Sequence, residues 1–240
     1  MKQIIKILFL ILLIVIMAIS SIIVSKNIKE DIEEEKIIEQ VIDTAYQKDN
    51  TEDFEEEHSN INIKNLYEQN KDIIAWIRIN NSNINYPIMQ TLNNPNFYLR
   101  KNFYKQYSYY GTPYLSEQCD INTSDNLIVY GHHIKNSKMF GELENYKRQE
   151  YYNNHKNINI YTLNDERNYE IIYVFKAIIN NGFDYYNYIN FNSESEFNTF
   201  KNKCKELAFF DTQIDCNYKD KFIDAGIQQC TYNGNIYAAP

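Results

Sequence analysis

An unbroken run of apolar and small residues from Ile7 to Val24 constrains this chain more than any other feature. With the two isoleucines that precede Lys6, the run reaches about 20 residues, the length of helix that spans a bilayer core of about 30 Å. Lys6 lies near the end of the run, where a long basic side chain can reach the membrane interface. We therefore expect residues 1–27 to form a transmembrane anchor.

A cleaved secretory signal peptide is the alternative interpretation of this run. Signal peptides usually have a shorter apolar region, about 7 to 15 residues, that ends in a small-x-small cleavage site. Ala18-Ile19-Ser20 faintly matches such a site, but the apolar run continues beyond it. We therefore prefer an uncleaved, single-pass anchor. A short N-terminal tail before a large domain favours an N-inside, C-outside orientation, which puts the domain on the extracellular side of the cell membrane.

Charge is distributed unevenly along the 240 residues, whose formal net charge is −8. From Lys29 to Glu57 the chain carries thirteen acidic residues against three lysines, whereas the part that follows is nearly neutral. Phosphate contacts need clustered Lys and Arg, so a nucleic-acid partner is not expected. The acidity belongs to one segment and does not dictate what the rest of the chain binds.

This acidic segment is predicted to be a stalk. Residues 28–46 have isoleucines near helical spacing with Glu and Lys between them, which predicts a helix. The repeat is too short to sustain a coiled-coil dimer. Residues 48–60 are polar and acidic and resemble a linker or a loosely held helix start. We therefore assign 28–62 to an acidic stalk helix and linker, and 63–240 to the globular domain.

The globular part has the pattern of a mostly β fold. Two alternating stretches, 75–79 and 84–88, flank the turn residues 80–83 and predict a hairpin. Ser193 and Glu196 form a capping box that opens a helix. Its inner stripe is Phe197, Phe200, Cys204 and Leu207. Further strands are predicted at 125–131, 158–162, 169–179 and 222–229. Many short strands with few helices predict a closed barrel or a sandwich with helical insertions.

Four histidines are the first candidates for chemistry. His132 and His133 directly follow the strand that ends at Gly131, a position from which a side chain can project into a cleft. On composition alone, a structural role for them remains the alternative. Adjacent residues on a strand point to opposite faces, and no His or Cys cluster has zinc spacing, so we expect no metal site. His58 is expected to be solvated in the linker, and His155 to lie in a loop.

Four cysteines are the second set of candidates. Cys204 lies on the apolar stripe of its helix and is predicted to pack there, whereas Cys119 and Cys216 lie in polar, loop-like contexts. The separation of Cys204 and Cys216 is compatible with a disulfide but does not require one. Cys230 follows a predicted strand. A thiol has a pKa of about 8.5 and needs a nearby base or cation to be a good nucleophile at neutral pH, which His132 would supply if the two are in contact.

The segment Asp125 to Lys135 (DNLIVYGHHIK), continued by Lys138-Met139-Phe140-Gly141, closely resembles the histidine segment of class B sortases. The resemblance covers roughly 63 to 232, nearly the whole globular part. The combination of several matching stretches is more specific than any one motif. The other stretches that resemble the family are 76–79 with 84–90, 96–99, 184–189 and the capped helix.

This resemblance implies a mostly β, sortase-like eight-stranded β-barrel with helical insertions. It also implies a membrane-anchored cysteine transpeptidase that needs no cofactor. In such enzymes a Cys thiolate attacks a Thr carbonyl in a sorting signal near the C-terminus of a secreted protein, and class B relatives favour Asn-Pro-x-Thr-like or related Pro-x-Thr signals. An amine of the cell-wall peptidoglycan peptide then resolves the thioester. Carried over here, His132 would donate and accept the proton and Cys230 would be the nucleophile.

The sequence departs from the family around the nucleophile. The family has a Thr-Leu-x-Thr-Cys-like run where this chain has Gly226-Ile227-Gln228-Gln229-Cys230. The family Arg that binds substrate and stabilises the oxyanion, about eight residues further on, corresponds to Ala238. We assign none of the arginines to that role. Because the sequence stops at Pro240, we expect the last barrel strand to be missing or the end to be rebuilt. A catalytically inactive, truncated domain that at most binds sorting peptides is the alternative to an active enzyme.

Overall fold

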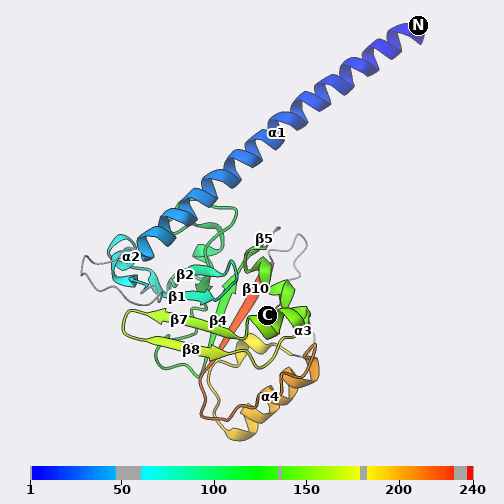
Figure 1. The fold of residues 1–240 in the computed structure, drawn as a ribbon. Helices are drawn as coiled ribbons and strands as arrows, with labels where there is room; N and C mark the ends of the chain where they lie inside the picture. The colour runs from blue at the N-terminus through cyan, green and yellow to red at the C-terminus, as the bar shows by residue number, and fades with distance from the viewer. Residues whose placement is uncertain (1, 47–60, 135–136, 179–182, 230–236, 240) are drawn as a thin grey trace. The chain divides into compact units, whose positions relative to one another are not determined.

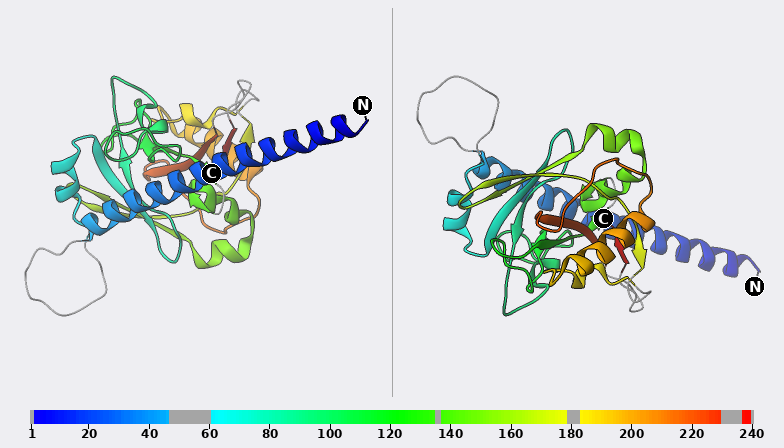
Figure 2. Two further views of the ribbon diagram at one scale, coloured as in Figure 1. Left: turned by 90° about the horizontal axis from the view of Figure 1, so that it is seen from above. Right: turned by 90° about the horizontal axis from the view of Figure 1, so that it is seen from below.

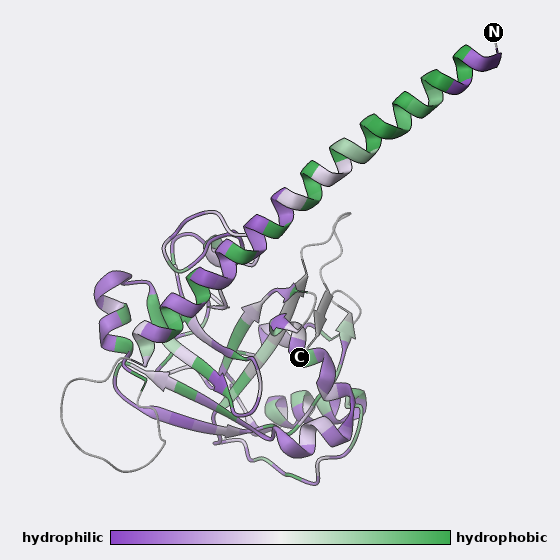
Figure 3. Cartoon of the chain, turned by 45° about the horizontal axis from the view of Figure 1, so that its top comes forward, coloured by the Kyte–Doolittle hydropathy of each residue, from purple (hydrophilic) through white to green (hydrophobic). Residues whose placement is uncertain are grey.

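The computed structural model describes residues 2–46, 61–134, 137–178, 183–229 and 237–239. Two compact units divide the chain, Met1–Gln40 and Val41–Pro240, and each is described by itself. The first unit belongs to α1 (Lys2–Ala45), one continuous helix in which the predicted anchor and stalk helix are joined. Its N-terminal part is apolar and its later part is polar (Figure 3), and by length and composition it can cross a membrane.

The second unit is built on a nine-stranded sheet among the described residues, in the order β8-β7-β1-β2-β3-β4-β10-β11-β9 (Figure 1). Most neighbouring strands are antiparallel, but β2 with β3 and β4 with β10 are parallel. A separate two-stranded sheet is formed by β5 (His133–Ile134) and β6 (Lys138–Met139). The strands of the large sheet are β1 (Ile73–Ile79), β2 (Asn85–Met89), β3 (Tyr114–Leu115), β4 (Asn126–Gly131), β7 (Asn157–Thr162), β8 (Glu166–Glu170), β9 (Ala177–Ile178), β10 (Phe222–Gln229) and β11 (Tyr237–Ala239).

This sheet forms a nearly closed barrel. The two strands at the ends of the order, β8 and β9, follow each other in the chain and are separated only by residues 171–176. A connection that short keeps the two ends of the sheet close together, since a residue spans at most about 3.3–3.6 Å. The predicted β-barrel with helical insertions is therefore confirmed, although the described sheet has nine strands where eight were expected.

Short helices precede β1 or lie in the connections between these strands. They are α2 (Ile63–Gln69), η1 (Phe97–Arg100), η2 (Phe140–Lys147), α3 (Gln149–Asn154), η3 (Tyr185–Asn187) and α4 (Glu194–Leu207). The predicted capping box opens α4: the Ser193 side chain accepts from the Glu196 amide, and the Glu196 carboxylate accepts from the Asn192 amide at 2.8 Å. The views in Figure 2 show α4 beside β10, where the rings of Phe197 and Phe222 stack at 5.6 Å.

Five of the six predicted strands are found with small changes of boundary, but the stretch 169–179 is not one strand. The chain pairs with β7 only as far as Glu170, because its partner Asn157 is the first residue of β7. One further backbone bond, from the Ile171 amide to the Lys156 carbonyl at 2.8 Å, lies just outside both strands. The chain therefore leaves the sheet after β8 and returns as β9 at Ala177.

The core of the barrel contains the fully buried Trp76, and one cluster extends from it to the start of the domain. Val41 and Ala45, at the end of α1, are buried in this cluster with Leu66 of α2 and with Tyr98. Helical spacing places Val41 and Ala45 on one face, one turn apart. The last turn of α1 is thus part of the domain core.

The Asn70 side chain makes buried hydrogen bonds in this part of the core, and its substitution tests how much they contribute to stability. Its buried side chain donates to the Tyr98 hydroxyl at 2.8 Å and to the Phe103 carbonyl at 2.6 Å. We expect Asn70→Ala to lower the free energy of unfolding by about 1–3 kcal/mol, because both acceptors lose a buried partner. Urea unfolding checks this. The exposed Asn93→Ala is the control, and an equal loss in both variants would contradict the assignment.

Candidate active site

His132 is the residue after β4, at the end of the parallel pair β4–β10. The register of this pair runs from Asn126 opposite Phe222 to Gly131 opposite Ile227. Parallel strands bring their C-terminal ends to the same edge of a sheet. The chain therefore continues into His132 at the edge where β10 also ends.

A glycine before His132 allows a phenyl ring to close over the strand end. A Cβ at Gly131 would lie 2.5 Å from a ring carbon of Phe140, so no other residue fits without displacing that ring. The amide of Phe140 donates to the His132 carbonyl at 3.0 Å. Together these contacts fix the backbone of His132 and leave its side chain only 7% exposed.

The imidazole of His132 is held by one backbone group. Its Nε2 lies 2.6 Å from the carbonyl oxygen of Leu99, in η1. A carbonyl oxygen only accepts, so the hydrogen of this bond must be on Nε2. In the neutral ring the other nitrogen, Nδ1, is then unprotonated, and it is the atom that can take up a proton.

Burial lowers the pKa of His132 below its ordinary value, and the charge of Arg100 lowers it further. The bond to Leu99 acts in the opposite direction, because it favours the protonated ring. The net direction is down, so the imidazole is neutral at neutral pH. A neutral ring with an unprotonated nitrogen is the form required of a base.

Cys230, the predicted nucleophile, lies outside the described residues. The strand β10 ends at Gln229, the residue directly before it. The last barrel strand, expected to be missing, is found: β11 pairs with β10 and with β9, and Ala238 lies opposite Gln228 and Ala177. The expectation offered a missing strand or a rebuilt end. Three residues suffice to pair with two neighbouring strands, so the strand is not missing among the described residues, although Ala238 brings no cation.

Each of the three described cysteines is a buried thiol. Cys119, expected in a polar loop, packs under β4, where its sulfur accepts from the amide of Ile128 at 3.4 Å. Cys204 is buried on the inner face of α4 as predicted. Cys216 is buried in a neighbouring cluster, and burial raises the pKa of its thiol. A raised pKa makes the Cys216 thiol a poor nucleophile, and burial of all three side chains is consistent with packing roles.

The remaining histidines lie apart from this arrangement. His133 is in β5 and pairs with Met139. His155 follows α3, stacks on Tyr151 at 3.9 Å and contacts the Asn81 carbonyl through Nε2 at 3.0 Å. His58 lies outside the described residues. His132 is therefore the described histidine that the fold buries at the joined ends of β4 and β10.

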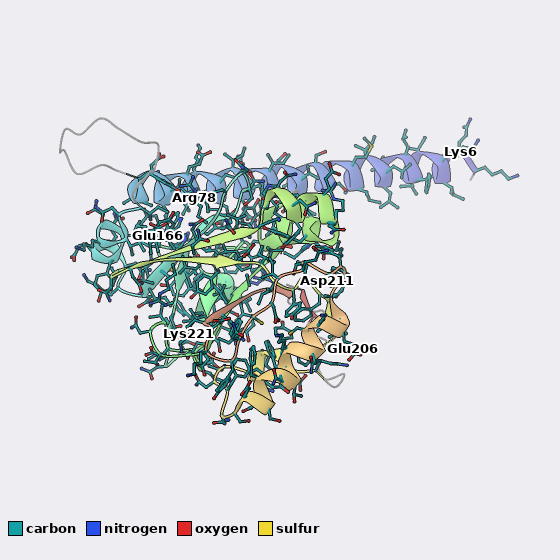
Figure 4. The ribbon with its side chains drawn as sticks, turned by 60° about the horizontal axis from the view of Figure 1, so that its bottom comes forward. Lys6, Arg78, Glu166, Glu206, Asp211 and Lys221 are labelled. Carbon is teal, nitrogen blue, oxygen red and sulfur yellow. The ribbon has the colours of Figure 1, made fainter. Side chains whose placement is uncertain are left out.

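Sequence reasoning missed Leu99 and Arg100. A backbone carbonyl is present at every residue, so no pattern distinguishes the one at Leu99. Arg100 donates to the Tyr109 carbonyl at 3.0 Å and lies over the Tyr109 ring at 5.2 Å. By contrast, Arg78 of β1 lies over Tyr46, and Figure 4 shows it at the end of the domain that also holds Glu166.

A cavity of about 320 Å³ lies elsewhere, between β8, β10 and α4, and its lining does not include His132. Its walls are mainly apolar, with Cys204 and Cys216 among them. Among the residues that the structure describes, no group of three or more His, Cys, Asp or Glu side chains is arranged to hold a metal ion.

Comparison with known proteins shows which proteins this barrel, with its buried histidine after the parallel pair β4–β10, resembles. No protein-family model matches the chain. Sortase B of Staphylococcus aureus (strain NCTC 8325 / PS 47) is 25% identical over 209 residues, which are 82% of this chain and 84% of the relative. Sortase B of Listeria monocytogenes serovar 1/2a (strain ATCC BAA-679 / EGD-e) is 25% identical over 165 residues, 67% of this chain and 64% of the relative.

Solved structures agree at the level of the fold. Sortase B from B. anthracis in complex with AAEK1 has a TM-score of 0.72 and 23% identity, covering 88% of this chain and 97% of that one. The S. aureus sortase B–substrate complex has a TM-score of 0.67 and 22% identity, covering 74% and 82%. The predicted resemblance to class B sortases is therefore confirmed in sequence and in fold, and it supports a sortase-type cysteine transpeptidase.

The lowered pKa of His132 predicts how stability depends on pH. Between the unfolded value of about 6.5 and the lower folded value, the unfolded chain binds more protons. Stability contributed at His132 is therefore complete above about pH 6.5 and is lost as the pH falls through the folded pKa. We expect the free energy of unfolding to fall more between about pH 7.5 and about pH 5 in the wild type than in His132→Gln. Urea titrations at both values test this, and identical pH dependence in the two proteins would contradict it.

Proposed function

We propose that this chain is a membrane-anchored cysteine transpeptidase that cleaves a C-terminal sorting signal after Thr and transfers the protein to a peptidoglycan amine. The observation that carries the proposal is the buried His132 at the edge where β10 ends. Gln229, the last residue of β10, directly precedes Cys230 in the sequence. The sortase B relatives support the same reaction. One solved relative is a sortase B–substrate complex, which supports a peptide substrate.

The proposed reaction has two steps that share one covalent intermediate. His132 takes the Cys230 proton through Nδ1, and the thiolate attacks the Thr carbonyl carbon. The C–N bond breaks, the leaving amine takes the proton from the imidazolium, and a thioester remains. A peptidoglycan amine then attacks the thioester, its proton passes to the base, and the thiolate is released. Splitting amide exchange in this way replaces one difficult step with two easier ones.

The proposed location is the cell membrane, with the catalytic domain outside. Support comes from the apolar part of α1, which has the length and composition of a membrane-spanning helix. The proposed clients are secreted proteins that carry the sorting signal. A tethered enzyme on the outer surface meets such clients and the cell-wall amine on the same side of the membrane.

A specific observation supports a second candidate, an inactive domain that at most binds sorting peptides. The position that corresponds to the family Arg is Ala238, which lies in β11 opposite Gln228. An alanine side chain cannot donate a hydrogen bond to an oxyanion. Removal of one such donor typically costs about 10²–10³ in kcat, so the test must detect slow turnover.

The test uses the full-length chain in detergent micelles, a peptide with a Pro-x-Thr core, and triglycine, a molecule found complexed in one sortase B structure. We expect a mass increase on Cys230 from the acyl-enzyme, and a product in which the peptide is linked to triglycine. Cys230→Ala should abolish both, and His132→Gln should reduce the rate about 10²–10⁴-fold, since proton transfer contributes that much.

The neighbouring His133→Gln is the matched control and should retain the rate. Turnover that survives Cys230→Ala would sink the proposal. Peptide binding by the wild type without an acyl-enzyme, in long incubations, would favour the inactive alternative.

A further inference from the structure

The acceptor of the His132 bond is itself held in a tight backbone arrangement. Gly111 has a φ of +61°, a left-handed conformation that favours glycine. A Cβ at this position would lie 2.6 Å from the Leu99 carbonyl oxygen and 2.8 Å from that of Tyr98. The Leu99 carbonyl therefore has His132 Nε2 at 2.6 Å on one side and the bare backbone of Gly111 on the other.

Several bonds close the loop that connects these two residues. The Ser108 amide donates to the Arg100 carbonyl at 3.1 Å, and the Thr112 amide donates to the Tyr98 carbonyl at 3.0 Å. The buried Ser108 hydroxyl accepts from the Gly111 amide at 3.0 Å. The stretch that carries Leu99 and the stretch that carries Gly111 therefore run side by side at fixed distance.

Arg100 fastens the same loop through its side chain and adds a charge. Its guanidinium bonds the Tyr109 carbonyl at 3.0 Å and lies over the Tyr109 ring at 5.2 Å. A planar guanidinium held on both an acceptor and a ring has little rotational freedom, which is an arrangement that Lys does not reproduce. Because Arg100 directly follows Leu99, this fixed cation belongs to the segment that contacts His132.

We propose that the loop from Leu99 to Gly111 is a positioning element for His132. In it the Leu99 carbonyl orients the imidazole, Gly111 leaves room for that carbonyl, and Arg100 clamps the loop and supplies a fixed positive charge. The inference rests on the proposed function, since it gives His132 the orientation and neutral form that a base needs. Other ionisable groups near this loop are held elsewhere: Lys101 lies over the Phe97 ring at 5.9 Å, Lys138 bonds the Tyr110 hydroxyl at 3.0 Å, and Lys105 pairs with Asp72 at 2.8 Å.

The first experiment follows His132 directly, so that it does not depend on activity. The full-length chain is labelled with ¹⁵N-histidine in detergent micelles, and His132→Gln assigns its ring signals. We expect Arg100→Gln to shift the titration midpoint of His132 upward, because a nearby cation that disfavours the protonated ring is removed. Arg100→Lys should keep most of the wild-type midpoint. Arg148→Gln, at an exposed arginine whose guanidinium donates to the Asn145 side chain at 3.2 Å, should leave the midpoint unchanged.

The second experiment changes the carbonyl without changing charge. Gly111→Ala should weaken the Nε2–H signal of the bonded tautomer, and it should lower kcat about tenfold or more with KM little changed, since small misplacements of a catalytic group cost that much. Its stability is measured in parallel. If Gly111→Ala fails to fold, Arg100→Gln still tests the proposal. The measurements are the titration midpoint of His132 and a fall in kcat with KM little changed.

Two results would overturn the proposal: a His132 midpoint that is the same in Arg100→Gln and Arg148→Gln, or an unchanged Nε2–H signal in folded Gly111→Ala. Failure of the proposed function looks different. In that case the wild type forms no acyl-enzyme, while the His132 signals still respond to the substitutions at Arg100 and Gly111.

Discussion

The parallel pairing of β4 with β10 is the interaction on which the rest of the domain depends. Parallel neighbours require a crossover connection. Here the connection from β4 to β10 contains the strands β5 to β9 and the helices η2, α3, η3 and α4. The apolar residues Leu127, Ile128 and Val129 of β4 are buried, which fixes the β4–β10 pair in the interior of the sheet. Because parallel strands end at one edge, His132, the residue after β4, lies at the edge where β10 also ends.

The state of His132 follows from this placement. At the end of β4 the imidazole is buried, and its Nε2 lies 2.6 Å from the Leu99 carbonyl oxygen. A hydrogen bond to a charged group contributes about 1.5–3 kcal/mol, which favours the imidazolium. The pKa is nevertheless lowered, so burial and the charge of Arg100 outweigh that bond. The burial that surrounds the His132 ring therefore also favours its neutral form.

The sequence predicted the parts of this arrangement that depend on local patterns. The alternation around 80–83, the apolar run before Gly131 and the capping box at Ser193 each specify an element through its own residues. The positions that sequence did not predict depend on distant partners. The strand expected at 169–179 ends at Glu170 because β7 begins at Asn157, and no pattern within the segment records that limit. The Leu99 carbonyl has no sequence signature, and β11 is a strand of only three residues.

Ala238 bears on one of two contributions to the proposed reaction, the stabilisation of the oxyanion, and leaves the other, nucleophilic attack with proton transfer, untouched. Nucleophilic attack and proton transfer require a thiol and a base, whereas stabilisation of the oxyanion requires a donor at the carbonyl oxygen. The strand that would carry the donor is present, opposite Gln228, but its side chain there is a methyl group. Losing one donor costs about 10²–10³ in rate, while the thiol and base steps retain their own contributions. If Cys230 and His132 act as proposed, the consequence is therefore a slow enzyme, and not a chain without chemistry.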